Sequence, residues 1–217
     1  DSYDNPLKTL NVNIIGCANI LKACVHNKVK KFILASSIYA NTSQGGFYRV
    51  SKQSCEIMTM EFSKVYKLDY TILRFGSLYG EGAGKNNGIN YIIDNYLKKN
   101  ILSYKGKKNA ARKYIHVEDA CLACIKSISR SYDNKYLNIT GKKKIKVLIV
   151  MKHMAKLFKY KKNLKFKNLE IEGHYVNEPR VFKPRKGINL YLKKYKNIKN
   201  ELINLIKERR LKKWLSL

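Results

Sequence analysis

A tyrosine and a lysine stand four residues apart in the segment Gly-Gly-Phe-Tyr-Arg-Val-Ser-Lys, at Tyr48 and Lys52. On a helix this spacing places both side chains on one face. A tyrosine hydroxyl is a poor base at neutral pH because its ordinary pKa is about 10, and a neighbouring ammonium group favours its ionised form. The pair could therefore let Tyr48 accept and return a proton. A surface tyrosine beside a solvated lysine is the alternative, because both residue types are abundant here.

Two hydroxyl side chains come before this pair, at the end of a predicted strand. Residues 31–35 form a short apolar run that predicts a buried parallel strand, and Ser36 and Ser37 follow it. In a doubly wound sheet, ligands bind outside the carboxyl ends of such strands. The serines are therefore placed to contact a substrate, or they simply form a turn. A turn-rich segment, 41–46, then leads into the helix of the Tyr–Lys pair. Apolar residues recur along that helix at Val50, Cys55, Met58, Phe62 and Val65.

The helix predicted before this strand has one polar residue in its apolar stripe. Asn5–Pro6 is a typical helix start, and the apolar periodicity continues to about His26. Asn13 lies three residues after Leu10 and four before Cys17, so we expect it to face inward. A buried amide needs hydrogen-bond partners. Asn13 is therefore expected to make a structural or active-site hydrogen bond.

The rest of the chain alternates predicted strands and helices. A strand over 68–74 ends at Phe75 and Ser77, and a loop rich in Gly and Asn follows. Arg112 lies in a strand that leads into an acidic helix start, where its guanidinium could grip a phosphate or simply lie at the surface. The other predicted elements are helices over about 89–99 and 145–160, an extended piece over 102–106, strands over 136–140 and 164–169, and a Lys-rich amphipathic helix from Gly187 onward, with Leu190, Leu202, Leu205 and Ile206 facing inward.

The net charge of the 217 residues is +30, which would ordinarily indicate a nucleic-acid or anionic-membrane partner. Arg contributes only 8 of the 45 basic residues, although proteins that read phosphates and bases tend to favour Arg. The lysines are also spread along the whole chain. We therefore expect a solvated Lys surface that reflects biased residue usage. A basic nucleic-acid-binding protein is the alternative function.

The cysteines form an odd set without the spacing of a disulfide framework, which indicates a reducing cytoplasm. The Cys-x-x-Cys pair has the surroundings of a buried helix and no second Cys or His pair, so we predict small apolar core residues and no metal site. No apolar run reaches the roughly 18 residues of a membrane span, so no membrane partner is expected. The cysteines are Cys17, Cys24, Cys55, Cys121 and Cys124.

Taken in order, these motifs resemble the extended short-chain dehydrogenase/reductase family, namely the NAD-dependent epimerases and dehydratases that act on nucleotide sugars. The resemblance runs from Asn5 to about residue 180. It implies an α/β fold with a doubly wound, Rossmann-like parallel sheet and a small C-terminal substrate-binding lobe. The matching segments are Asn13-Ile-Ile-Gly16, Phe32-Ile-Leu-Ala-Ser-Ser37, Tyr48-Arg-Val-Ser-Lys52, Thr71-Ile-Leu-Arg-Phe-Gly-Ser-Leu-Tyr-Gly80 and Arg112-Lys-Tyr-Ile-His-Val-Glu-Asp119.

The resemblance implies catalytic roles for three residues. Tyr48 would be the general acid/base that takes a proton from a sugar hydroxyl while hydride leaves the same carbon for the nicotinamide. Lys52 would bind the nicotinamide ribose and lower the Tyr48 pKa. Ser37 would hydrogen-bond the reacting oxygen of the substrate, with Ser36 as the rival because the segment up to Tyr39 is shorter than in the usual family form.

Binding roles follow from the same resemblance. Asn13 would support the hydrogen-bond network beside the cofactor, and Ser36 is a further cofactor-binding candidate. Phe75 and Ser77 would line the nicotinamide end of the site, and Arg112 would grip the diphosphate of a nucleotide-sugar substrate. The cofactor would be NAD or NADP.

The sequence departs from the family at both ends. It contains no Gly-x-x-Gly-x-x-Gly turn that opens a helix after a strand, nor the acidic residue that follows it in the family. We therefore expect that the amino-terminal part of the fold is absent from these 217 residues and that they do not hold NAD tightly. The predicted parts are a Rossmann-like portion over 1–80, a mixed substrate-binding lobe over 81–185 and a Lys-rich helical tail over 186–217.

Epimerisation, dehydration and reduction of a nucleotide sugar all begin or end with the same tyrosine-assisted hydride transfer. The segment Ser37–Tyr39 lacks the acidic pair expected of a dehydratase, which favours an epimerase or a reductase. The resemblance further suggests cytoplasmic surface-polysaccharide synthesis and a homodimer formed through the helices of Asn13 and Tyr48. A non-catalytic fragment that merely retains the fold is the remaining alternative.

Overall fold

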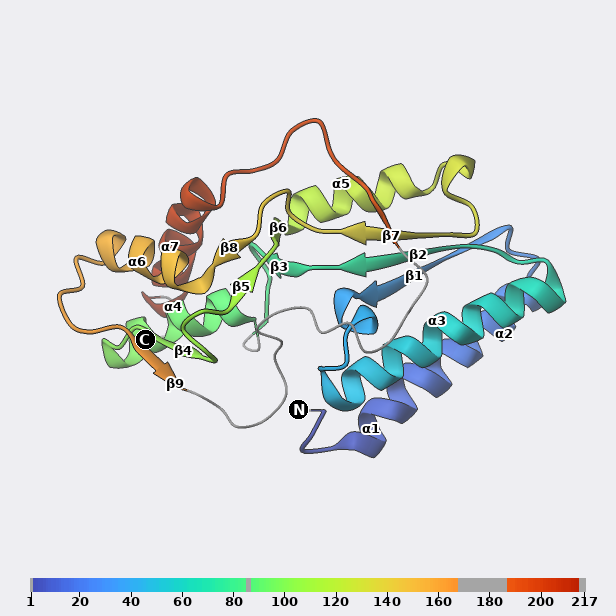
Figure 1. The fold of residues 1–217 in the computed structure, drawn as a ribbon, viewed down its shortest axis with the longest axis horizontal. Helices are drawn as coiled ribbons and strands as arrows, with labels where there is room; N and C mark the ends of the chain where they lie inside the picture. The colour runs from blue at the N-terminus through green and yellow to red at the C-terminus, as the bar shows by residue number, and fades with distance from the viewer. Residues whose placement is uncertain (1, 85–86, 168–186, 215–217) are drawn as a thin grey trace. The chain divides into compact units, whose positions relative to one another are not determined.

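The computed structural model describes residues 2–84, 87–167 and 187–214 of the protein (Figure 1). The described residues form two compact units. The first contains residues 2–76, 122–139 and 187–191, and the second contains residues 77–84, 87–121, 140–167 and 192–214. The chain therefore passes between the units several times, whereas the sequence-based boundaries lie at residues 80 and 185.

The first unit is built on a four-stranded sheet in which every pair of neighbours is parallel. Its strands, in spatial order, are β1 (Lys31–Ser37), β2 (Asp69–Phe75), β7 (Lys135–Ile139) and β10 (Ile188–Asn189). The central strand β2 is an almost continuous buried run, as expected for a parallel strand covered on both faces. Ser37 pairs in register with Phe75, so both lie at the carboxyl end of the sheet. The α/β fold with a Rossmann-like parallel sheet is confirmed.

Two long helical segments lie side by side next to this sheet (Figure 1). The first is continuous through α1 (Pro6–Leu10), the π-helical turn η1 (Asn11–Ile15) and α2 (Gly16–His26), and the second is α3 (Gly46–Tyr66), which follows the short 3₁₀ helix η2 (Ile38–Asn41). Asn5 caps α1 by accepting a hydrogen bond from the Lys8 amide at 3.0 Å, as predicted from the Asn–Pro start. The core between these helices and the sheet includes Leu21, Leu34, Cys55 and Ile72.

The remaining element of the first unit is the carboxyl half of α5 (Val117–Ser127), which is followed by the 3₁₀ helix η3 (Arg130–Tyr132). The Lys31 ammonium at the start of β1 donates to the carbonyls of Ser127, at 3.0 Å, and Ser129, at 3.1 Å. It also forms an ion pair with Asp133 at 2.6 Å. A cation at a helix carboxyl end complements the helix dipole, so this contact fixes the start of β1 against the end of α5.

The second unit packs three helices around an apolar core. The helices are α4 (Gly88–Lys99), α6 (Val147–Leu157) and α7 (Ile198–Trp214). Three strand pairs accompany them: β3 (Ser77–Tyr79) with β6 (Tyr114–His116) and β4 (Ser103–Lys105) with β9 (Lys165–Lys167), both parallel, and β5 (Ala111–Arg112) with β8 (Ile145–Lys146), which is antiparallel. Ile93, Leu102, Met151 and Leu202 are among the fully buried residues of this core.

Three expectations about local structure are wrong. The chain from Gly187 is not helical at once, because Ile188 and Asn189 pair with β7 and α7 begins only at Ile198. Val50 and Val65, expected in the apolar stripe of α3, are 38% and 65% exposed. Cys121, expected in the core, is exposed on α5. Each error has the same physical cause, since a local pattern of apolar residues does not say which face tertiary contacts will cover.

A strand was predicted over residues 164–169. β9 covers Lys165–Lys167 of this range, and residues 168 and 169 lie outside the described part of the chain. Over the described ranges, no helix combines the length and the apolar character needed to cross a membrane.

Gly141 offers a sharp test of the packing in the second unit. A Cβ atom at this position would lie 1.9 Å from the Tyr114 carbonyl oxygen, so a side chain would push two backbone segments apart. We expect Gly141→Ala to destabilise the protein by about 1–3 kcal/mol, the usual cost of overpacking. The measurement is the urea midpoint of unfolding at constant slope.

Gly88→Ala is the matched control, because a Cβ atom there meets nothing within 4 Å at the start of α4. Its urea midpoint should stay the same or rise. Equal losses of stability in the two variants would contradict this description of the second unit.

Candidate active site

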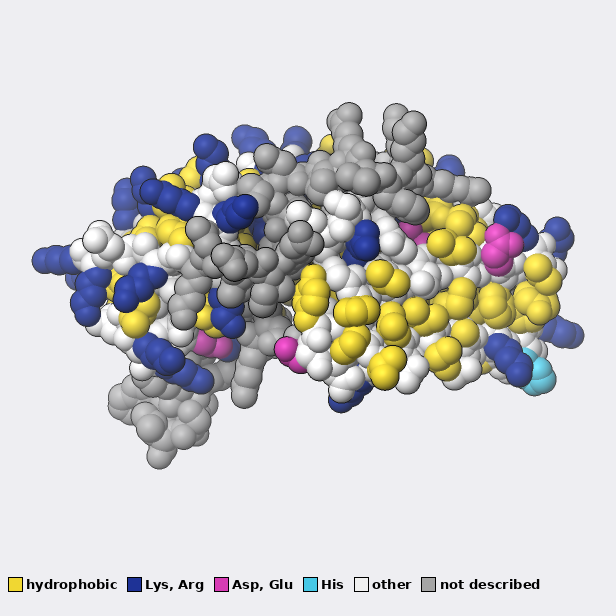
Figure 2. All heavy atoms as spheres, turned by 60° about the horizontal axis from the view of Figure 1, so that its bottom comes forward, with side chains coloured by type: hydrophobic (Ala, Val, Ile, Leu, Met, Phe, Trp, Pro, Cys, Tyr) yellow, Lys and Arg dark blue, Asp and Glu magenta, His cyan; other side chains and the backbone are white. Residues whose placement is uncertain are grey.

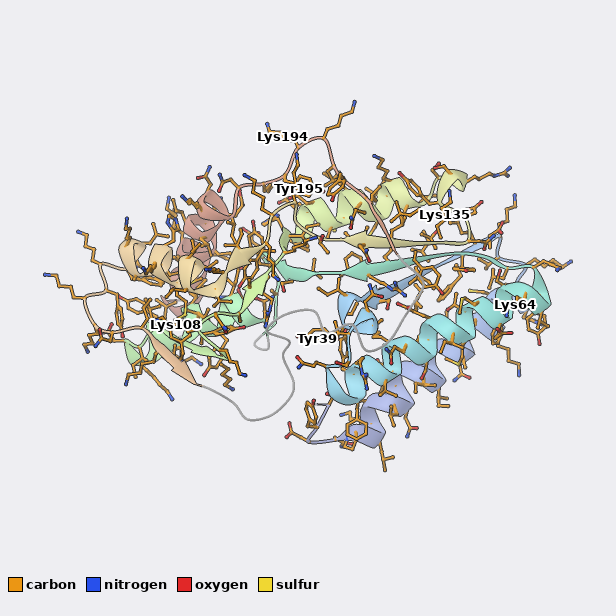
Figure 3. All side chains as sticks on the ribbon, in the orientation of Figure 1. Tyr39, Lys64, Lys108, Lys135, Lys194 and Tyr195 are labelled. Carbon is orange, nitrogen blue, oxygen red and sulfur yellow. The ribbon has the colours of Figure 1, made fainter. Side chains whose placement is uncertain are left out.

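Tyr48 and Lys52 lie in the first two turns of α3, whose start is set by two glycines. Gly45 adopts a φ of +114°, and a Cβ atom at this residue would lie 2.7 Å from Cδ1 of Tyr39. Only glycine fits this turn without strain. Tyr39, on η2, lies close to the first turn of α3 (Figure 3), and its ring makes an edge contact with the Tyr48 ring at a centroid distance of 6.3 Å. The turn therefore fixes where α3 begins, two residues before Tyr48.

The Tyr48 phenol interacts with Ser37 and is 36% exposed. Partial burial raises the pKa of Tyr48 above its ordinary value, and the hydrogen bond with the Ser37 side chain lowers it by a smaller amount. The phenol is therefore protonated at neutral pH. This differs from the expectation that the neighbouring lysine would lower the Tyr48 pKa. The Ser37 oxygen also accepts a hydrogen bond from the Tyr39 amide at 3.3 Å, which orients it at the end of β1.

Lys52 is on the same face of α3 as Tyr48, as the four-residue spacing predicts. Its ammonium nitrogen is 5.7 Å from the centroid of the Tyr48 ring and donates to the Ala35 carbonyl at 3.0 Å. The ammonium thus bridges α3 and β1. A lysine carries three donor hydrogens, so this contact leaves donors of Lys52 for a ligand.

Asn13 is half-buried in the π-helical turn η1 and is bonded to α3. Its side-chain amide donates to the Ser51 hydroxyl at 2.9 Å, and Ser51 in turn donates to the Tyr48 carbonyl at 2.8 Å. The Asn13 carbonyl accepts from the Cys55 thiol at 3.2 Å. The expected inward-facing hydrogen bond of Asn13 is therefore present. The π-turn, which a pattern of apolar residues does not predict, belongs to a class of helix irregularity that is frequent at functional sites.

Ser36 and Ser37 have different partners, although they are neighbours on β1. The Ser36 hydroxyl is buried and donates to the Glu56 carboxylate at 2.5 Å. Ser37, by contrast, is bonded to Tyr48. Sequence reasoning missed Glu56, which lies four residues after Lys52 and so continues the face of Tyr48 and Lys52 by one more turn. The i, i+4, i+8 spacing of Tyr48, Lys52 and Glu56 was the signal that could have found it.

The other predicted site residues are divided between the units. Phe75 ends β2 beside Ser37 in the first unit. Ser77 begins β3 in the second unit, where it pairs in register with Tyr114. Arg112, on β5, is buried and donates to the Ala111 carbonyl at 3.0 Å and to the Tyr104 hydroxyl at 3.3 Å.

No cluster of three or more histidine, cysteine or acidic side chains that could hold a metal ion occurs in the described ranges. The geometry therefore brings together Asn13, Ser37, Tyr48, Lys52 and Phe75 within the first unit, without a metal centre among the residues that the structure describes.

The sequence profile of the NAD dependent epimerase/dehydratase family matches residues 1–140. The chain belongs to this family. The matched range holds all the site residues discussed above, including the Tyr–Lys pair and Arg112. The extended short-chain dehydrogenase/reductase resemblance is thereby confirmed.

Curated relatives within this family carry the names of sugar-nucleotide epimerases. The chain is 24% identical over 228 aligned positions to a UDP-glucuronate 4-epimerase of Thermodesulfobacterium geofontis, covering 95% of this chain and 70% of that protein. It is 27% identical over 160 positions to a putative UDP-glucose 4-epimerase of Methanocaldococcus jannaschii, covering 65% of this chain and 52% of that protein. The alignments therefore span between about half and 70% of these two relatives.

Solved structures support the fold of this family member. A UDP-glucose 4-epimerase of Thermotoga maritima, solved with UDP-glucose, superposes with a TM-score of 0.78 at 21% identity, over 97% of this chain and 73% of that one. A UDP-glucuronic acid 4-epimerase of Bacillus cereus, solved with UDP-glucuronic acid and NAD, superposes with a TM-score of 0.75 at 19% identity, over 92% of this chain and 68% of that one. At these identities the likeness concerns the fold alone.

The Ser37–Tyr48 contact can be tested without any assay of activity. Because the hydrogen bond with Ser37 lowers the Tyr48 pKa, Ser37→Ala should raise that pKa further. The pKa is measured by NMR of protein labelled at the tyrosine ring carbon that bears the hydroxyl, with the Tyr48 signal assigned from Tyr48→Phe.

Ser54→Ala is the matched control, because the Ser54 hydroxyl on the same helix donates only to the Val50 carbonyl within its own helix, at 3.0 Å. The Tyr48 pKa should not move in this variant. A Tyr48 pKa that stays the same or falls in Ser37→Ala would show that the contact does not act on the phenol.

Proposed function

We propose that this chain carries the acid–base centre of an NAD-dependent epimerase that acts on a UDP-sugar. The observation that supports this most directly is the joint placement of Ser37, Tyr48 and Lys52, with the phenol bonded to Ser37 and the ammonium over its ring. The family match and the 4-epimerase names of the relatives support the same reaction. The missing acidic pair after Ser37 favours epimerisation or reduction over dehydration.

The residues at the carboxyl end of β1 and the start of α3 suit the nicotinamide end of the cofactor. Tyr48 is partly exposed and Lys52 has donors beyond the one used by Ala35, so both can hydrogen-bond the hydroxyls of a ribose. Asn13 holds the α3 backbone behind them, and Phe75 and Ser77 would line the ring side of the site. Ser36 is a further candidate for the cofactor side, although its hydroxyl is engaged by Glu56. Bound NAD would supply reversible hydride transfer; NADP is the alternative.

Tyr48 would act as the base and then as the acid. Its hydroxyl oxygen would take the proton of the sugar hydroxyl as the carbon is oxidised, and return it when the carbon is reduced from the opposite side. Ser37 would donate a hydrogen bond to the same sugar oxygen. Since partial burial raises the pKa of the phenol, its ionised form needs positive charge nearby. Lys52 and the nicotinamide cation would supply that charge when the cofactor is bound.

Arg112 would grip the diphosphate of the substrate. Its guanidinium donates to the Ala111 carbonyl and the Tyr104 hydroxyl, and these contacts orient the group. A planar cation of this kind suits a phosphate oxygen pair. Supply of an epimerised sugar for cytoplasmic surface-polysaccharide synthesis is part of the same proposal, and it rests on the family resemblance.

The decisive variant for this reaction is Tyr48→Phe, which removes only the hydroxyl oxygen. We expect turnover of the UDP-sugar to fall by about 10²–10⁴-fold, the usual contribution of general acid–base catalysis. The assay follows interconversion of UDP-glucose or UDP-glucuronic acid with their C4 epimers, in protein expressed from its whole coding sequence.

Tyr66→Phe, at the exposed end of the same helix, is the control and should retain full activity. The Tyr48→Phe protein should still bind NAD, more weakly only by the roughly 0.5–1.5 kcal/mol of one hydrogen bond to the ribose. Unchanged turnover in Tyr48→Phe would exclude the proposed role of Tyr48, whereas a lack of UDP-sugar turnover in the unaltered protein would favour the non-catalytic alternative. If the protein bound nucleic acid, and this affinity fell steeply as the salt concentration rose, the alternative function of a basic nucleic-acid-binding protein would be favoured.

We also propose that a second copy of this chain covers an apolar face of the first unit. Figure 2 shows a broad band of hydrophobic side chains on one side of the molecule. Contiguous exposed apolar surface of this kind marks an interaction site. A second copy is the proposed occupant, since the family resemblance places the dimer on these helices. Among the exposed apolar residues on α1, η1, α2 and α3 are Leu7, Val12, Ile15, Ile20, Phe47, Val50, Ile57, Val65 and Tyr66.

Sedimentation analysis tests this dimer. We expect the unaltered protein to sediment as a dimer at micromolar concentration and the double variant Val12→Asp, Ile57→Asp to sediment as a monomer, because charges would be buried without partners. Ile125→Asp is the control, since Ile125 is as exposed as Val12, at 65%, but lies on α5 and not on these helices. A monomeric unaltered protein would contradict the proposal.

A further inference from the structure

A buried carboxylate connects the catalytic helix to the sheet. Glu56 on α3 is 5% exposed. One of its oxygens accepts hydrogen bonds from the Ser36 hydroxyl at 2.5 Å and from Nε of Arg74 at 2.9 Å. The other oxygen accepts from Nη2 of Arg74 at 2.6 Å. Glu56 therefore binds β1 through Ser36 and β2 through Arg74.

The arginine of this group is enclosed on its other side as well. Arg74 is 1% exposed, and its guanidinium carbon lies 4.5 Å above the centroid of the Tyr136 ring on β7. A guanidinium is favoured over an aromatic face, and its fork matches a carboxylate. The Tyr136 hydroxyl donates to the sulfur of Met60 at 2.7 Å, one turn beyond Glu56 on α3. One face of α3 is thus joined to three strands of the sheet.

The contacts of β1 with α3 come in a pair. Ser36 bonds Glu56, and its neighbour Ser37 bonds Tyr48. Tyr48 and Glu56 are eight residues apart, which is about two turns of an α-helix. Two adjacent residues of one strand therefore hold the helix at two points on the same face. If α3 slid along β1 or rotated, both contacts would be lost together.

We propose that Glu56 is a positioning residue, which fixes the register of α3 against β1 through Ser36 and Arg74 and so holds the Tyr48 hydroxyl on Ser37. Its consequence for turnover rests on the proposed function of Tyr48. Its consequence for the Tyr48–Ser37 contact does not, because that contact belongs to the fold itself. Glu56 touches neither substrate nor cofactor in this account.

The alternative is that the ion pair contributes only to stability. Removing Glu56 alone would leave a buried guanidinium without its counter-charge, so that variant could simply unfold. Two gentler changes avoid this. Ser36→Ala removes the contact with β1 and keeps the ion pair. The double variant Glu56→Leu, Arg74→Met removes both charges and the acceptor of the Ser36 hydroxyl together, and replacing a buried ion pair by apolar groups of similar volume is often tolerated.

The readout is the Tyr48 signal in the NMR titration of protein labelled at the hydroxyl-bearing tyrosine carbon. In both variants we expect the Tyr48 signal and pKa to move in the direction seen in Ser37→Ala, because the Ser37 contact is lost. Met60→Leu is the control: it removes the acceptor of the Tyr136 hydroxyl on the same helix, and should leave the Tyr48 signal unchanged.

Activity supplies the second readout, in protein expressed from its whole coding sequence. We expect Ser36→Ala to lower kcat for the UDP-sugar by tenfold or more, with KM changed less than twofold. Ser36→Thr, which restores a hydroxyl, should recover most of kcat. Folded variants whose Tyr48 signal does not move would overturn the positioning role, whatever their activity. A moved Tyr48 signal in a protein without UDP-sugar turnover would uphold the positioning role and reject the proposed function.

Discussion

A carboxylate removed from water must find positive charge and hydrogen-bond donors inside the protein, and Glu56 finds both where β1 and β2 end. Arg74 supplies the charge and Ser36 supplies a further donor. Because these partners stand on two neighbouring parallel strands, α3 can satisfy Glu56 in only one register. The position of Tyr48 two turns earlier follows from that register. The position of the Tyr48 hydroxyl therefore depends on the buried contact of Glu56 with Ser36 and Arg74.

The electrostatics of Tyr48 follow from this placement. Partial burial raises the pKa of the Tyr48 phenol, and the hydrogen bond with the Ser37 side chain offsets only part of that effect. The Lys52 ammonium donates a hydrogen bond to the Ala35 carbonyl and not to the phenol. The residues of the chain thus orient the Tyr48 phenol in its protonated form, which cannot accept a proton at neutral pH. In this account the acid becomes a base only when further positive charge approaches the phenol, so proton transfer is coupled to the bound cofactor.

The order of the motifs was sufficient to predict the parallel α/β fold, the start of α3 and the placement of Tyr48 and Lys52 on one face of it, because these depend on local spacing. The family resemblance assigned Ser37 to the reacting oxygen of the substrate, with Ser36 as the rival. The structure separates them, since Ser36 is bonded to Glu56 and Ser37 to Tyr48. Glu56 itself was missed because a charged residue on a helix is usually solvated, and its burial depends on Arg74, which is 18 residues away in the sequence.

The errors have the same origin. Ile188 and Asn189 were expected in a helix, yet they pair with β7, a partner about 50 residues distant that no local pattern reveals. The buried residues of α3 include Ser51, Glu56 and Thr59, whereas the predicted Val65 is exposed. Glu56 finds its partners on β1 and β2, Ser51 is bonded to Asn13, and Thr59 donates to the Cys55 carbonyl of its own helix. Non-local contacts therefore decide the parts of the site that spacing alone does not.

The measurement that tests the central claim most directly is the Tyr48 pKa with and without NAD, followed by NMR of tyrosine-labelled protein expressed from its whole coding sequence. Without NAD the pKa should lie above the ordinary value for tyrosine. With saturating NAD it should fall clearly, because positive charge beside the phenol favours the ionised form. A Tyr48 pKa that stays raised while NAD is bound would contradict the account, since the phenol could not then serve as the base.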